Sequence, residues 1–195
     1  MFNKKSLNPI LAEAIFPQKT REKWVEYFNS QDYDVILTTA SLSLRLAMIA
    51  PRLKAATIGW QHNCYDGYLH VKPVVFWQQE NLLQQYLPNL DRYIVLSDYD
   101  KRDYMEKLGI DCEVKINPRS FVSEKKCDVK SKRFLMATRF VYAKGLDLMM
   151  ESFEEFCKED SEWELDIIGD GDLFDQIRAD AKKRHLEKRV HFVGY

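Results

Sequence analysis

Residues 133–150, RFLMATRFVYAKGLDLMM, decide the fold of this chain of 195 residues. The first part, 133–138, is almost continuously apolar, which is typical of a short strand buried in a parallel sheet. From residue 143 onward the apolar side chains recur at the spacing of a helix with one buried side. A strand that leads through a short loop into an amphipathic helix is the repeating unit of an α/β sheet.

The same alternation of short apolar runs and helical patterns extends over most of the sequence. It predicts an α/β architecture of Rossmann-like domains, with parallel sheets flanked by helices and right-handed crossovers. The apolar character of the runs also indicates strands that are covered on both faces. The predicted strands are 34–39, 55–60, 92–97, 112–117, 133–138, 163–169 and 189–194, and the predicted helices are 41–53, 72–87, 98–108, 143–158 and 172–186.

A polar, lysine-rich segment interrupts this alternation. It reads NPRSFVSEKKCDVKSKR over residues 117–133, opens with Asn-Pro and has no apolar period. Proline disfavours helix at the residue before it and cannot donate to a strand ladder. We therefore predict an N-terminal domain at 1–118, a linker at 119–132 and a C-terminal domain at 133–195.

The composition predicts a folded protein without a general affinity for nucleic acid. Hydrophobic residues make up 46% of the chain and charged residues 30%, which suits a sizeable core. The 29 basic and 30 acidic residues nearly cancel, so any site for an anion must be local. We find no basic stripe of the kind that nucleic-acid-binding domains carry.

Cysteine usage and hydropathy favour the cytoplasm. The four cysteines are scattered, with no CxxC pair and no metal-ligand spacing to a histidine, so we expect free thiols and no bound metal. The N-terminal residues lack the apolar core of a signal peptide, and no run approaches the ~20 apolar residues of a membrane span.

A peripheral position at the inner face of the cell membrane stays open. The stretch 41–54, SLSLRLAMIAPRLK, mixes apolar and basic residues. It is either an amphipathic helix that lies on an anionic surface or a packed core helix, and we favour the packed helix.

The loop within the opening stretch carries two cations. Arg139 follows the predicted strand, and Lys144-Gly145 stands where the helix begins. A helix N-terminus offers free N–H groups and the positive end of the helix dipole, so cations beside it suit a diphosphate. Two solvated loop residues are the alternative interpretation.

Two further motifs follow predicted strands. In IIGDGDLF, 167–174, the turn Gly169-Asp170-Gly171 lets the backbone approach a ligand closely, and Asp172 is a candidate N-cap of the next helix. In WQHN, 60–63, the strand end places His62 in a loop, where it suits hydroxyl recognition or proton transfer. A structural turn and a hydrogen-bonded structural histidine are the respective alternatives.

The order of these motifs resembles one enzyme family. WQHN is followed by VKINP at 114–118, by the opening stretch, by WELDIIGDGD at 163–172 and by RVHFVGY at 189–195. In this order the chain resembles the retaining glycosyltransferases of family 4, which have the GT-B fold of two facing Rossmann-like domains. The version here is most similar to bacterial enzymes of capsular and exopolysaccharide synthesis.

The resemblance implies transfer of a sugar, with retention, from a nucleotide-diphosphate donor to a lipid-linked saccharide or polysaccharide. The expected donor is a UDP-sugar, and the family needs no metal or other cofactor. By position, Arg139 and Lys144 match the residues that neutralise the diphosphate. Gly145 and the turn at 169–171 match donor-proximal loops, and His62 matches the catalytic histidine near the reacting sugar.

The chain departs from the family pattern in two ways. The family has glycine where this chain has Thr138, and its C-terminal domain continues to a Glu-x7-Glu segment that is not found before Tyr195. We therefore expect both Rossmann-like domains to be incomplete. The alternative function is a non-catalytic fragment or subunit that keeps the fold and a weak phosphate or nucleotide site.

An incomplete sheet has consequences for association. A sheet that stops after the strand at 189–194 leaves an unpaired edge there. We therefore expect self-association, or a partner subunit that covers this edge.

Overall fold

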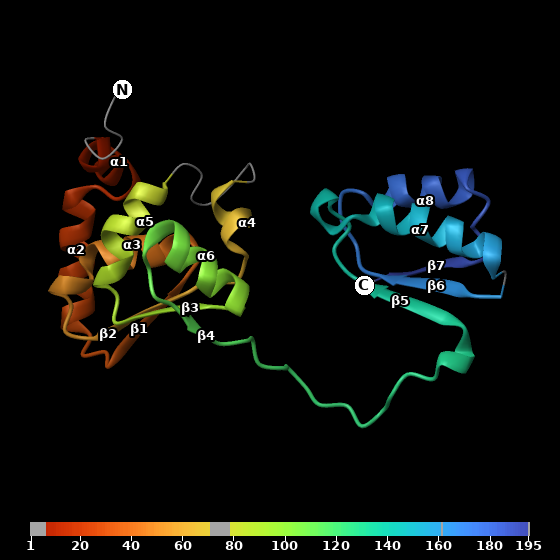
Figure 1. The fold of residues 1–195 in the computed structure, drawn as a ribbon, viewed down its shortest axis with the longest axis horizontal. Helices are drawn as coiled ribbons and strands as arrows, with labels where there is room; N and C mark the ends of the chain where they lie inside the picture. Colours follow the sequence, from red (N-terminus) through yellow and green to blue (C-terminus); the bar gives the residue numbers. More distant parts are fainter. Residues whose placement is uncertain (1–6, 71–78, 161, 195) are drawn as a thin grey trace. The chain divides into compact units, whose positions relative to one another are not determined.

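The computed structural model describes residues 7–70, 79–160 and 162–194. The chain divides into two compact units, Met1–Ser120 and Phe121–Tyr195, which we call unit 1 and unit 2. Each unit is an α/β layer structure with its own parallel sheet and its own hydrophobic core (Figure 1). The architecture predicted from the alternation of strands and helices is confirmed.

Unit 1 holds a parallel sheet whose strands follow chain order, β1-β2-β3-β4. The strands are β1 (Val35–Thr39), β2 (Ala56–Trp60), β3 (Arg92–Val95) and β4 (Glu113–Val114). Among the described residues the helices are α1 (Asn8–Ile15), α2 (Gln18–Ser30), α3 (Ser41–Ile49), α4 (Tyr65–Leu69), α5 (Glu80–Tyr86) and α6 (Asp98–Leu108), with 3-10 turns η2 (Ala50–Arg52) and η3 (Leu87–Asn89).

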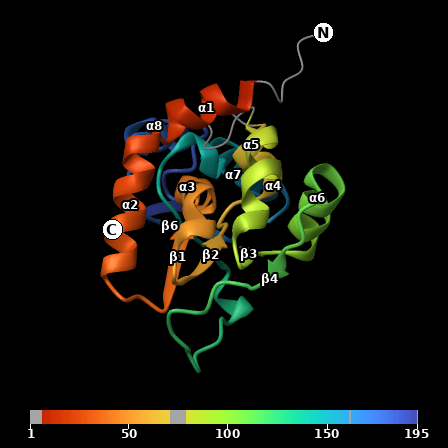
Figure 2. The same ribbon diagram turned by 90° about the vertical axis from the view of Figure 1, so that its left-hand side faces the viewer.

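The strand order places the connecting helices of unit 1 on one face of the sheet. Crossovers between neighbouring parallel strands are right-handed, so strands in chain order carry their helices on the same side. Figure 2 shows α3 over β1 and β2. Burial follows this arrangement, because Ile36 is buried whereas its neighbours Val35 and Leu37 are 50% and 49% exposed.

Helix α3 is a core helix. Six of its nine residues are buried, among them Leu44, Leu46 and Ile49. Of its apolar residues Leu42 alone is exposed, at 40%. One exposed leucine does not make an apolar side for a lipid surface, so the packed interpretation of the stretch 41–54 is correct.

Unit 2 repeats the same plan with three strands in the order β5-β6-β7. Its elements are η4 (Val129–Ser131), β5 (Arg133–Ala137), η5 (Tyr142–Lys144), α7 (Leu146–Glu159), β6 (Glu164–Ile168), α8 (Phe174–Lys183) and β7 (Val190–Gly194). Both helices lie on one side of the sheet (Figure 1). The predicted apolar stripe of α7 faces the core, where Leu146, Met150 and Phe153 are buried.

All seven predicted strands are present, although β4 is only two residues long. The helices α1, α2 and α4 were not predicted, and the part 72–78 of one predicted helix lies outside the described residues. The prediction that the strands are covered on both faces is wrong for the described residues. The reason is the chain-order topology, which leaves the second face of each sheet open, as the 66% exposure of Leu135 in β5 also shows.

Phe140 is predicted to hold the core of unit 2 together. Its ring is fully buried and lies 5.3 Å from that of Phe174 and 6.3 Å from that of Phe192, measured between centroids. Phe140→Ala should lower the free energy of unfolding of unit 2 by about 3–5 kcal/mol, because it opens a cavity. Urea titration followed through the amide NMR signals of β6 measures this.

The matched control is Tyr142→Ala. Tyr142 lies two residues further along the same loop and is 84% exposed, so its loss should change the free energy of unfolding by at most about 0.5 kcal/mol. Equal losses in the two variants would contradict the assigned role of Phe140.

The edge of β7 is predicted to support self-association. Val193 is an exposed apolar residue on this edge strand, which pairs only with β6 among the described residues. A lysine on an edge strand opposes pairing with another chain. Val193→Lys should therefore reduce the associated fraction in sedimentation velocity, whereas Leu148→Lys, at an exposed apolar position on α7, should not.

Candidate functional site

The two predicted cations lie at the carboxyl end of β5. Arg139 stands two residues beyond the strand, and Lys144 ends the turn η5. Gly145 follows in a left-handed conformation, with φ of 61°, and serves as the N-cap of α7. This conformation, which glycine adopts without a steric penalty, lets the chain turn directly from the loop into the helix.

The first turn of α7 keeps free donors. Its N-cap residue has no side chain, and no side-chain cap hydrogen bond is made. The first N–H groups of a helix lack partners within the helix, and the dipole adds partial positive charge there. Asp147 in the first turn supplies one opposing negative charge. The end of the helix is thus open to an anion from the side of the loop.

Arg139 and Lys144 are available to a ligand. Both side chains are exposed, and neither makes a hydrogen bond or an ion pair with any residue that the structure describes. Two cations on or next to the strands of unit 2 are engaged: Arg133 binds Asp166, and Arg189, next to β7, donates to the backbone carbonyl of Trp163. The loop therefore presents two unneutralised positive charges beside a helix N-terminus.

The predicted glycine turn lies against this loop. The backbone N–H of Phe140 donates to the carbonyl of Asp170 at 2.8 Å, and that of Leu173 donates to the carbonyl of Phe140 at 3.0 Å. The predicted residues Arg139, Lys144, Gly145, Gly169, Asp170 and Gly171 are thus gathered at one end of the sheet of unit 2.

The backbone of the turn lies so close to that of the loop after β5 that both positions require glycine. Their φ angles are 138° and 147°, a region that other residues rarely adopt. A Cβ on Gly169 would lie 1.8 Å from the carbonyl oxygen of Thr138, and one on Gly171 would lie 2.7 Å from that of Phe140.

The prediction of Asp172 as an N-cap is wrong. Helix α8 begins at Phe174, its N-cap is Leu173, and no side chain caps it. A turn that ends in the hydrogen bond from Phe174 N–H to the Gly171 carbonyl separates Asp172 from the helix. Phe140 was not predicted as a core residue, because it stands beside Val141 and Tyr142 in a loop that has no apolar period.

His62 lies in unit 1, in the loop that follows β2. It is exposed, and its ring stacks on that of Trp60 with 5.3 Å between centroids and an interplanar angle of 27°. The residue between them, Gln61, is fully buried and donates to the hydroxyl of Tyr93. Burial raises the pKa of Tyr93, so the phenol stays neutral and continues to donate to Tyr104.

A capping interaction fixes the end of the loop that holds His62. Ser97 and Asp100 at the start of α6 cap one another, because the Ser97 hydroxyl accepts from the Asp100 N–H and donates to its carboxylate. The same carboxylate accepts the backbone N–H of Tyr65 at 2.9 Å. Helix α4 is thereby tied to α6, and the loop 61–64 has both of its ends fixed.

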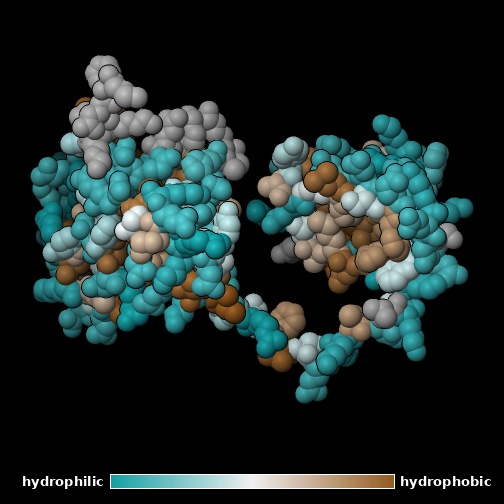
Figure 3. Space-filling view, in the orientation of Figure 1, coloured by the Kyte–Doolittle hydropathy of each residue, from teal (hydrophilic) through white to brown (hydrophobic). Residues whose placement is uncertain are grey.

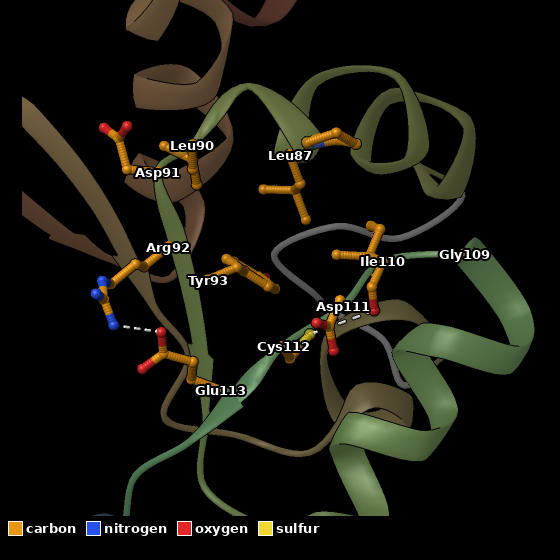
Figure 4. A pocket seen from close by; sticks show the side chains of 11 residues that line it. Leu87, Leu90, Asp91, Arg92, Tyr93, Gly109, Ile110, Asp111, Cys112 and Glu113 are labelled. Carbon is orange, nitrogen blue, oxygen red and sulfur yellow. Dashed lines mark hydrogen bonds and ion pairs between the residues drawn. The ribbon is translucent and has the colours of Figure 1, made fainter.

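A cavity of about 310 Å³ lies elsewhere in unit 1 (Figure 4). Its lining includes Arg92, which begins β3, and Cys112, which precedes β4, so it lies at the amino ends of these strands. Ligands of open α/β sheets bind at the carboxyl ends, which lie opposite. Within the cavity Arg92 pairs with Glu113, and burial raises the pKa of Cys112 to about 12, which keeps it an unreactive thiol.

Within the described ranges the chain has neither a metal-binding cluster nor a membrane-spanning helix. No three His, Cys, Asp or Glu side chains there are grouped so that they could hold a metal ion. No helix in that part of the chain has the length and hydrophobicity needed to cross a bilayer.

The proteins and the family that this chain resembles are glycosyltransferases. Residues 120–195 match the family described as Glycosyl transferases group 1. The alpha-monoglucosyldiacylglycerol synthase of Streptococcus pneumoniae is 22% identical over 92% of this chain and 46% of its own length. An uncharacterized glycosyltransferase of Haemophilus influenzae is 24% identical over 82% of the chain and 44% of its own length. The chain thus spans about half the length of these relatives.

Solved structures share the fold. A mutant of S. aureus TarM, in complex with Fondaparinux, alpha-GlcNAc-glycerol and UDP, superposes with a TM-score of 0.72 at 19% identity, covering 90% of this chain and 36% of TarM. The incompleteness expected from the sequence agrees with this coverage. Residues 120–195 are thus similar to the Glycosyl transferases group 1 family. The chain as a whole has the fold of part of a GT-B protein.

Proposed function

We propose that this chain acts in the transfer of a sugar, with retention, from a UDP-sugar to a lipid-linked saccharide or polysaccharide. We further propose that it belongs among the family 4 enzymes of bacterial capsular and exopolysaccharide synthesis. The observation that carries the proposal is the pair of unneutralised cations, Arg139 and Lys144, beside the open N-terminus of α7.

The chemistry of this pair suits a diphosphate. A guanidinium binds phosphate oxygens as a planar fork, and an ammonium acts as a mobile point charge. The free N–H groups of α7 add donors for a second phosphate. A single phosphate would leave part of this set unused, whereas a nucleoside diphosphate uses all of it.

The same groups would assist the reaction. When the bond between the sugar and the donor phosphate breaks, negative charge develops on the departing nucleoside diphosphate. Arg139, Lys144 and the helix end stabilise that charge by electrostatic interaction. Because these positive groups do the neutralising, we propose that the reaction needs no metal and no other cofactor.

His62 is the proposed catalytic residue on the side of unit 1. An imidazole can accept or donate a proton at its ring nitrogens. Its ring rests on Trp60, and the loop that carries it is fixed at both ends, so the imidazole is held at the carboxyl end of the sheet. We propose that it contacts the reacting sugar or the acceptor hydroxyl.

The names of similar proteins support the choice of substrates. A TarM structure contains UDP and alpha-GlcNAc-glycerol, and one relative is named for a glucosylated diacylglycerol. From these we propose UDP as the nucleotide and an acceptor linked to lipid, which would bring the protein to the cytoplasmic face of a membrane.

The second candidate function is a non-catalytic module with a nucleotide site. It would use the same two cations, Arg139 and Lys144, for the nucleotide. A chain that binds UDP with its proposed site yet transfers no sugar would fit this alternative.

Removal of both cations is predicted to weaken UDP binding. Each charge-assisted contact is worth ~1.5–3 kcal/mol when desolvated, and less at an exposed site. Arg139→Ala/Lys144→Ala should therefore lower the affinity for UDP at least about tenfold in isothermal titration calorimetry.

The control is Arg178→Ala/Lys183→Ala, which removes two exposed cations of α8 and should leave the affinity unchanged. Equal affinities of wild type and the Arg139/Lys144 double variant would refute the diphosphate site.

Removal of the histidine is predicted to separate binding from transfer. His62→Ala should retain the UDP affinity of the wild type, because the diphosphate groups lie in unit 2, and should lose sugar transfer by about 10²–10⁴-fold, as expected for an acid–base group. A radiolabelled-donor assay measures transfer. Full transfer by His62→Ala would exclude a catalytic role for this residue.

A further inference from the structure

The segment that joins the two units is strongly basic. Residues 115–133 contain seven Lys or Arg and two Asp or Glu, a formal charge of +5. Since the whole chain carries −1, the rest of it carries −6. The positive charge of this protein is therefore concentrated in one short stretch, although the composition as a whole is balanced.

Most of these cations are free. Lys132 pairs with Glu162, and Arg133 pairs with Asp166. The five others make no ion pair with any residue in the described ranges, and all are exposed. They are Lys115, Arg119, Lys125, Lys126 and Lys130. Their charge is thus available to an external partner.

The same segment exposes apolar side chains. Phe121, Ile116 and Val122 are 79%, 78% and 77% exposed, and every residue from Lys115 to Asp128 is exposed. Figure 3 shows brown side chains among teal ones along this connection. A spacer needs only flexible polar residues, so a phenylalanine and two branched aliphatic residues in such a segment call for another role.

Charge complementarity identifies the partner as an anionic surface. Polybasic segments are attracted to anionic lipid headgroups, and stable anchoring takes a second, apolar signal as well. Both signals occur here within a few residues. The alternative membrane segment, α3, buries all of its apolar side chains except Leu42 in the core of unit 1, so it lacks an apolar side for a membrane.

We propose that residues 115–133 form a membrane-contact segment, in which the free cations bind anionic headgroups and Phe121, Ile116 and Val122 enter the interface. The role of this segment, which is to bring the enzyme to a lipid-linked acceptor, rests on the proposed function. Its binding to an anionic membrane does not. Vesicle binding and UDP binding are measured separately, so either can fail without the other.

The experiment is co-sedimentation of the chain with phosphatidylcholine vesicles that do or do not contain phosphatidylglycerol. The wild type should bind only the anionic vesicles, and high salt should release it, because salt screens charge attraction. Lys125→Gln/Lys126→Gln should weaken binding about 25-fold, and Phe121→Ser should weaken it several-fold.

The matched control is Lys182→Gln/Lys183→Gln, an adjacent pair of exposed lysines at the end of α8. It removes the same charge from a helix and should leave vesicle binding within twofold of the wild type. Circular dichroism confirms that each variant is folded, which is expected because residues 115–128 form no helix or strand.

Three results would overturn the proposal. One is equal binding to vesicles with and without phosphatidylglycerol, or binding to neither. Another is an equal loss in the two double-lysine variants. The third is binding to poly-glutamate without binding to anionic vesicles, which would assign the segment to an acidic macromolecule instead of a membrane.

Discussion

The close approach of two loops is the constraint on which the site of unit 2 depends. Gly169 and Gly171 have no side chains, so the loop after β6 packs directly on the backbone of Thr138 and Phe140. Hydrogen bonds between Phe140, Asp170 and Leu173 hold the two loops at this distance. With its backbone fixed and Phe140 buried, the loop leaves Arg139 in solvent on one side. A larger residue at either glycine would separate the loops.

Whether a cation of unit 2 has a hydrogen-bond or ion-pair partner depends on its position in the fold. Arg133 lies on the open face of the sheet and is neutralised by Asp166 of the neighbouring strand. Arg189 donates hydrogen bonds to backbone carbonyls, among them that of Trp163. Arg139 and Lys144 lie beyond the strand ends, where no described carboxylate reaches them. Their availability thus follows from the length of β5 and the position of α7.

Strand order explains two other features of the molecule. Both sheets run in chain order, so right-handed crossovers place their helices on one face and leave apolar residues such as Leu37 and Leu135 exposed on the other. Each unit also has its own core, so the joining segment takes no part in either one. Its basic and apolar side chains therefore remain exposed.

The sequence alone determined the alternation of strands and helices, the positions of the seven strands and the two cations in the loop after β5. These are local properties, since periodicity and the residues beside a strand end are read directly from neighbouring positions. Only the tertiary structure decided which faces of the sheets are covered and that Phe140 is a core residue. It also decided that the glycine turn allows close packing of two loops, and that Asp172, which follows this turn, caps no helix. These features depend on which strands lie side by side, and contacts between residues distant in the chain leave no periodic trace in it.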